Sequence, residues 1–136
     1  MEYHTGRLID HVHLVVRDLE AAKRFYKAVV AAVKPSAQIN EGEDFLQVDE
    51  LYLSEGEPLS HIHLSFQAAD QDAVQSFYDA GLKAGGRDNG GPGERDYHPG
   101  YYGAFVYDPD GNNIEATYHG PSTRSAEDVV ITPTGG

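Results

Sequence analysis

Apolar and polar residues alternate near the start of the chain, which predicts a half-buried strand over residues 8–16. The residues on one face of this strand are Ile9, His11, His13 and Val15. Asp18 follows, and its carboxylate can accept hydrogen bonds from the free amide groups of a first helical turn. The next apolar residues recur at steps of three and four and predict a helix that ends near Pro35. They are Leu19, Ala22, Tyr26, Val29 and Val33.

The same pattern recurs 52 residues later without a gap. A strand is expected over residues 61–66, and Asp70 is expected to cap a second helix that ends at the pair Gly85 and Gly86. The apolar stripe of this helix is Val74, Phe77, Tyr78 and Leu82. The matched pairs are His11 and His63, Asp18 and Asp70, Phe25 and Phe77, and Tyr26 and Tyr78. A repeat of this length indicates two copies of one supersecondary unit.

Further strands are expected between and after the two helices. Residues 45–53 are rich in strand formers and can hold two strands, and residues 101–107 and 112–118 alternate as a hairpin. Asp108–Gly111 supplies the turn of this hairpin, because Pro suits its second position and Gly its positive φ. Residues 90–93 read Gly-Gly-Pro-Gly and predict a loop, which we expect to lie over the functional site.

These elements predict an α+β fold made of tandem βαβββ modules. We expect a curved sheet that forms a cup, with the helices outside and with His11 and His63 pointing into the cavity. A single domain would span residues 1–119 and contain two repeats at about 8–57 and 59–118. Residues 120–136 lose periodicity and are expected to be a mobile C-terminal tail.

Composition narrows the range of partners and compartments. The 136 residues include 22 acidic and 10 basic side chains, and the formal charge of −12 argues against nucleic acid or membrane surfaces as partners. No apolar run approaches the length of a membrane span, and the polar start does not resemble a signal peptide. The absence of cysteine fits a cytoplasmic protein.

Two histidines at equivalent positions of a repeat suggest a metal site that needs a carboxylate. Neutral imidazole and carboxylate together suit Zn, Ni, Mn, Co or Fe(II), and a site with open positions can polarise bound oxygens. Because both strands read His-x-His, a cupin site is an alternative, but cupins lack the two amphipathic helices predicted here. Under the repeat, His13 matches Ser65 and His61 matches Ile9, so neither has a histidine counterpart.

Several stretches together resemble the vicinal-oxygen-chelate superfamily, which includes glyoxalase I, extradiol dioxygenases and bleomycin-resistance proteins. They are residues 10–18, Phe25-Tyr26, residues 63–66 and residues 107–115, the last reading Tyr-Asp-Pro-Asp-Gly-Asn-Asn-Ile-Glu. The resemblance runs from about Leu8 to His119. It implies a divalent metal held by His11, His63 and Glu115.

The resemblance also implies a function, with alternatives. The first is a metal-dependent, glyoxalase-like enzyme acting on a small metabolite that chelates the metal through vicinal oxygens. An extradiol-type ring-cleaving dioxygenase and a metal-free protein that binds a drug or metabolite are the alternatives. The expected partners are a small-molecule substrate and a second copy in a homodimer, because open-cup domains often pair to cover their sheet edges.

The remaining candidates surround the expected cavity. His98 and His13 are candidate bases, and Tyr101 is a candidate hydroxyl donor to a bound oxygen. Glu50 lies near the place where glyoxalase I carries a fourth ligand. Strand alternation puts Tyr101, Gly103 and Phe105 on one face of their strand, and it puts Asn113, Glu115 and Thr117 on one face of the next strand. The pocket is therefore expected to be aromatic and lightly polar, which suits a carbonyl or phenolic metabolite.

Overall fold

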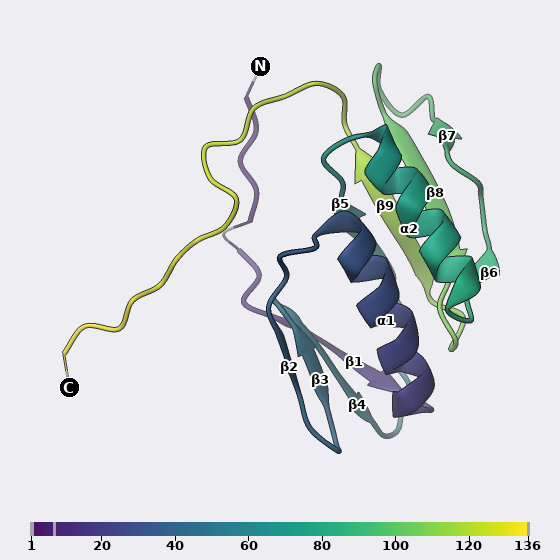
Figure 1. Cartoon of the computed structure of the whole chain (residues 1–136), viewed down its shortest axis with the longest axis vertical. Helices are drawn as coiled ribbons and strands as arrows, with labels where there is room; N and C mark the ends of the chain where they lie inside the picture. Colours follow the sequence, from purple (N-terminus) through teal and green to yellow (C-terminus); the bar gives the residue numbers. More distant parts are fainter. Residues whose placement is uncertain (1, 7, 136) are drawn as a thin grey trace.

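The computed structural model describes residues 2–6 and 8–135, and two βαβββ modules make up most of it (Figure 1). The first module contains β1 (Val12–Val16), α1 (Leu19–Val33), β2 (Ile39–Glu41), β3 (Leu46–Val48) and β4 (Leu51–Glu55). The second contains β5 (His63–Gln67), α2 (Gln71–Lys83), β6 (Arg87–Asp88), β7 (Gly93–Glu94), β8 (Tyr102–Tyr107) and β9 (Asn113–Tyr118). The short strands β6 and β7 pair with different parts of β8 and together take the place of one strand. No helix in the described ranges has the length and apolarity needed to cross a membrane.

Each module forms its own mixed sheet. The first sheet has the order β1-β4-β3-β2, and the second has β5-β9-β8-β6 with β7 also paired to β8. In both sheets the first strand runs parallel to the last, so the two modules share one topology. The predicted α+β fold of tandem modules is confirmed. The expected single curved sheet is not present within one chain, because β1 and β5 do not pair with each other.

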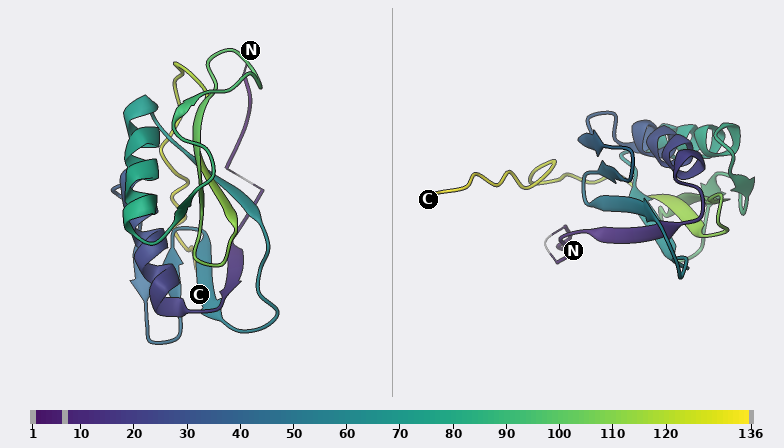
Figure 2. Two further views of the ribbon diagram at one scale, coloured as in Figure 1. Left: turned by 90° about the vertical axis from the view of Figure 1, so that its right-hand side faces the viewer. Right: turned by 90° about the horizontal axis from the view of Figure 1, so that it is seen from below.

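The two helices lie side by side and cover the same side of the molecule (Figures 1 and 2). One continuous apolar core fills the space between the helices and the two sheets, and it includes the repeat-matched rings Phe25 and Phe77, both fully buried. Burial of such large side chains supplies most of the favourable free energy of folding. The opposite face of each sheet, away from the helices, is called its open face below.

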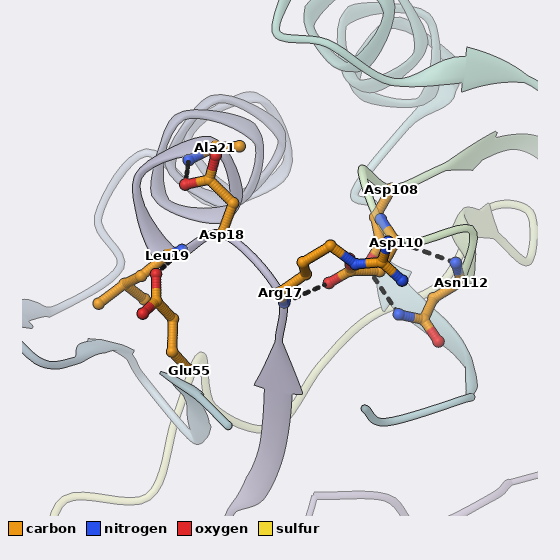
Figure 3. Close-up of polar contacts among 8 residues, drawn as sticks. All are labelled: Arg17, Asp18, Leu19, Ala21, Glu55, Asp108, Asp110 and Asn112. Carbon is orange, nitrogen blue, oxygen red and sulfur yellow. Dashed lines mark hydrogen bonds and ion pairs between the residues drawn. The ribbon is translucent and has the colours of Figure 1, made fainter. Parts of the chain in front are cut away.

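Equivalent helices begin after Asp18 and Asp70, as the repeat predicts. The Asp18 carboxylate accepts from the Ala21 amide at 3.2 Å, and the Asp70 carboxylate accepts from the Ala73 amide at 2.8 Å. Each caps one of the free amide groups of a first turn. Figure 3 shows the first cap, beside which Glu55 accepts from the amide of Leu19.

The strand predicted over residues 8–16 begins only at Val12. Leu8 and Ile9 are exposed and lie outside the sheet. The partner strand explains this later start, because the ladder begins with the Val12 amide donating to the carbonyl of Glu50, in the turn that precedes β4. Residues before Val12 have no neighbouring strand in the sheet and so do not extend β1.

The stripe predicted for the second helix is wrong at its last position. Leu82 is 37% exposed, while Gly81 is buried where α2 approaches α1 and β8. A Cβ at Gly81 would lie 3.3 Å from side-chain atoms of Val29 and Val106, so the residue without a side chain allows this approach. The contact of α2 with α1 and β8 therefore places Gly81, rather than Leu82, on the buried face of α2.

The turn between β8 and β9 joins the two modules. Tyr26 of α1 donates to the buried Asp108 carboxylate at 2.5 Å. The Arg17 amide donates to Asp110 at 3.1 Å, as Figure 3 shows. Asp108 also accepts from the backbone amides of residues 110 and 112 and from the side chain of Asn112. The Asp-Pro-Asp-Gly turn thus uses its acidic residues to hold the modules together.

Candidate metal and ligand site on the open face of the second sheet

The open face of the second sheet gathers the predicted polar residues. Glu115 on β9 lies opposite Phe105 on β8 and opposite Ser65 on β5. The alternate residues Ile114 and Ala116 are fully buried against the core, so Glu115 and Thr117 must face the other way. The strand alternation predicted for residues 101–107 and 113–117 is confirmed.

Glu115 is the centre of a hydrogen-bond network on this face. Its Oε1 lies 2.9 Å from His63 Nε2, and its Oε2 accepts from the Tyr101 hydroxyl and, at 2.9 Å, from Thr117. The Glu115 side chain is only 3% exposed, whereas that of His63 is 54% exposed. A buried carboxylate needs such donors, since an unpaired buried charge is strongly unfavourable.

Tyr101 reaches Glu115 because Gly103, two residues further along the chain in β8, has no side chain. A Cβ at Gly103 would lie 3.2 Å from the Tyr101 ring and 3.3 Å from Glu115 Oε2. Burial, and then the hydrogen bond to Glu115, raise the pKa of the Tyr101 hydroxyl. Tyr101 therefore remains a protonated donor at neutral pH.

A pair of stacked histidines flanks Tyr101. His98 Nε2 lies 2.8 Å from His119 Nδ1, the two rings stack, and both meet the Tyr101 ring edge to face. His98, a predicted base, therefore contacts Tyr101 rather than Glu115 or His63. His119 was missed by sequence reasoning, and its place at the end of β9, four residues after Glu115, is the signal that could have found it.

The other predicted residues lie on the first module. His11 is exposed and its Nδ1 lies 2.7 Å from Asp10, while His13 Nε2 lies 2.7 Å from the hydroxyl of Ser54. Glu50 lies in the exposed turn before β4 rather than on a strand. The register gives Tyr52 as the counterpart of Glu115, because Tyr52 lies opposite His13 as Glu115 lies opposite Ser65.

A single chain brings together two of the three expected metal ligands. His63 Nε2 and Glu115 Oε1 lie 2.9 Å apart, a distance at which both could bind one divalent ion. His11 is not with them, and no three His, Asp or Glu side chains within residues 2–6 and 8–135 are close enough to hold a metal. The donor set of one chain therefore does not complete a metal site.

A recess of about 240 Å³ adjoins His63. It is lined by His61, Ile62, His63, Tyr107, Gly111 and Asn113. His61, which has no histidine counterpart under the repeat, lines this recess. A small ligand that contacts His63 could extend into it, although the volume is at the low end for ligand sites.

The chain belongs to the glyoxalase/bleomycin resistance protein/dioxygenase superfamily, whose family model matches residues 8–116. This confirms the resemblance to the vicinal-oxygen-chelate superfamily.

Solved structures agree with this assignment. A glyoxalase/bleomycin resistance protein from Albidiferax ferrireducens T118 is 28% identical with a TM-score of 0.67, covering 81% of this chain and 97% of that one. A glyoxalase/bleomycin resistance protein/dioxygenase family enzyme from Burkholderia phytofirmans PsJN is 20% identical, with a TM-score of 0.61 and coverage of 79% and 95%. A glyoxalase-related enzyme from Fulvimarina pelagi is 19% identical, with a TM-score of 0.61 and coverage of 88% and 99%. The last two support the fold alone. No curated protein matches the chain.

Proposed function

We propose that the protein is a cytoplasmic, metal-dependent, glyoxalase-like enzyme that acts on a small metabolite bearing vicinal oxygens. The observation that carries this proposal is the contact of 2.9 Å between His63 Nε2 and Glu115 Oε1 on the open face of the second sheet. Zn, Ni, Mn, Co or Fe(II) suits these ligand atoms, and the bound ion would supply Lewis-acid polarisation of two neighbouring oxygens.

The third proposed ligand, His11, requires a second copy of the chain. Each of β1 and β5 has one edge that pairs with no strand of the described chain, and an edge without a partner strand favours pairing with another chain. On β1 the backbone groups of Val15 are already bonded to Ser60. In a twofold homodimer, β1 of one chain would lie beside β5 of its partner. His11 of one copy would then approach His63 and Glu115 of the other, giving two identical sites.

The chain's own residues would position the ligand and handle protons. Tyr101 holds a proton on its hydroxyl and can donate it in a hydrogen bond to Glu115 or to a ligand oxygen beside it. His98 and His119 can pass a proton between their facing nitrogens at the edge of Tyr101. His13 would enter the same site from the first module of the partner.

A complementation experiment tests the shared site. We expect His11→Ala and Glu115→Ala each to bind almost no zinc. When equal amounts are unfolded and refolded together, half of the dimers contain one copy of each variant, and each of these carries one complete site. Zinc binding should therefore recover to about a quarter of the wild-type stoichiometry. No recovery on mixing, with wild type refolded alone as the control, would rule out a site shared between chains.

The second candidate is a metal-free protein that binds a drug or metabolite. It is favoured by the contacts of Glu115. The two oxygens of this carboxylate already have three hydrogen-bond partners within one chain, so the buried group is stabilised without a metal. Elemental analysis of untagged protein, followed by titration with Zn, Ni, Mn and Fe(II), separates the two candidates. About one ion per chain supports the enzyme, and the absence of binding for all four ions supports the metal-free reading. An Fe(II)-specific site would instead favour the ring-cleaving dioxygenase.

A further inference from the structure

An arginine lies over the aromatic ring next to the candidate site. The guanidinium carbon of Arg95 is 5.4 Å from the centre of the Phe105 ring, and the centre of the His63 ring lies 6.2 Å from it. Phe105 lies opposite Glu115 in the strand register. Arg95 and His63 therefore flank one ring on the open face.

The Gly90–Gly93 loop fixes the position of this guanidinium. Arg95 donates to the carbonyls of Gly91, at 2.8 Å, and Glu94, at 3.2 Å, and its backbone amide donates to the carbonyl of Tyr101. A Cβ at Gly90 would lie 3.3 Å from both Arg95 Nη2 and the Phe105 ring. Glycine there leaves room for the guanidinium over the ring, an arrangement that stabilises a cation.

Arg95 is a cation without a carboxylate partner in the described ranges, in a chain with a net charge of −12. Arg17, Lys23, Lys27 and Lys34 form ion pairs with acidic residues. Arg24, Lys83, Arg87 and Arg124 lack one within these ranges as Arg95 does, so the position of Arg95 over Phe105 is what distinguishes it. Two of the five N–H groups of Arg95 are used by the loop carbonyls, and the others keep the planar geometry that matches a carboxylate. On a strongly acidic protein, an anion needs such a local positive group to bind.

We propose that Arg95 recognises the carboxylate of the ligand, so that the site takes small monocarboxylates with an apolar or aromatic portion against Phe105. The proposal rests on the function proposed above for the choice of site, and it names the chemical class of the ligand. A single free guanidinium suits one negative charge. Arg87, on β6, lies 5.0 Å over Tyr107, and Tyr107 is two residues further along β8 than Phe105, opposite Asn113 rather than Glu115.

Benzoate and benzamide test this proposal, because they share a shape and differ in charge. Isothermal titration with protein dialysed against a chelator should show benzoate binding that weakens with added NaCl, and at least tenfold weaker binding of benzamide. Arg95→Met should weaken benzoate binding at least tenfold, while Arg87→Met and Arg24→Met, the latter on the exposed side of α1, should stay within about twofold of wild type.

The outcomes separate this proposal from the one on which it rests. Benzoate binding without zinc binding would support the role of Arg95 and contradict the proposed metal-dependent enzyme. Zinc binding without benzoate binding would contradict only the role of Arg95. Equal binding of benzoate by Arg95→Met and wild type, or phosphate binding ten times more tightly than benzoate, would overturn the proposal. If Arg95→Met does not fold, Arg95→Lys decides, because it keeps the charge but loses the planar fork and should weaken benzoate binding about threefold or more.

Discussion

Glu115 shows how a single residue can be both structurally satisfied and chemically available. It is almost completely buried, yet each of its donors is a side chain that faces the open side of the sheet. Its buried position makes the donors important for stability, since removing one from a buried carboxylate costs more than a typical hydrogen bond contributes. Tyr101 is the donor most easily removed without changing shape.

Tyr101→Phe is therefore expected to lower the free energy of unfolding by about 1–3 kcal/mol, because Glu115 loses one donor. Under the proposed function it should leave zinc stoichiometry unchanged, since Tyr101 is not a proposed ligand. Denaturant unfolding and zinc titration measure the two effects. Tyr97→Phe is the matched control, because Tyr97 packs on Tyr101 but is 67% exposed, and it should change stability by less than about 0.5 kcal/mol. A loss of zinc in Tyr101→Phe would contradict the assignment.

At the scale of elements, the sequence predicts which face of a strand a side chain occupies better than it predicts which strands lie side by side. Alternation correctly assigns Glu115 and Phe105 to the open face, because a side chain's face depends only on its own strand. The same pattern does not say which strand lies beside β1, and so it could not show that His11 lies apart from His63. Arg95 was missed for a related reason. Its place depends on the backbone of Gly90, with φ of +139°, and on a ring ten residues away in the sequence.

The helix caps give a prediction at this scale. Asp70→Ala should lower the free energy of unfolding by about 1 kcal/mol, because the Ala73 amide loses its acceptor at the start of α2. Asp70→Asn should change it by only a few tenths, since asparagine caps helices about as well as aspartate. Thermal or urea unfolding monitored by circular dichroism distinguishes the two variants. Equal losses in both would mean that the negative charge, rather than the cap, stabilises α2.

At the scale of the whole molecule, the contact between Tyr26 and Asp108 links folding to pH. Burial, and then the neighbouring Asp108 carboxylate, raise the pKa of Tyr26 well above its ordinary value. A raised folded-state pKa means that the folded state keeps a proton that the unfolded state releases above about pH 10. The stabilising contribution of Tyr26 is therefore fully present below about pH 10 and is lost as the pH rises above it.

Tyr26→Phe should reduce this fall. Between pH 10 and 11 the wild-type free energy of unfolding should drop by up to about 1.4 kcal/mol per pH unit for each tyrosine whose pKa is raised in the folded state. Tyr78 and Tyr101 also have raised pKa values, so part of the slope should persist in the variant. Urea unfolding at a series of pH values measures both slopes. Identical slopes in the two proteins would show that Tyr26 is not responsible.

The contact between Tyr26 and Asp108 also bears on how the chain could be divided. It joins a helix of the first module to a turn of the second, and the apolar core runs without interruption across both modules. The peptide segment after β4 keeps the local concentration of one half high near the other, and it also contributes the hydrogen bonds between Ser60 and Val15. Two separate polypeptides, one for each half, would carry the same complementary surfaces. A gene broken between the halves would encode fragments that retain the information needed to assemble.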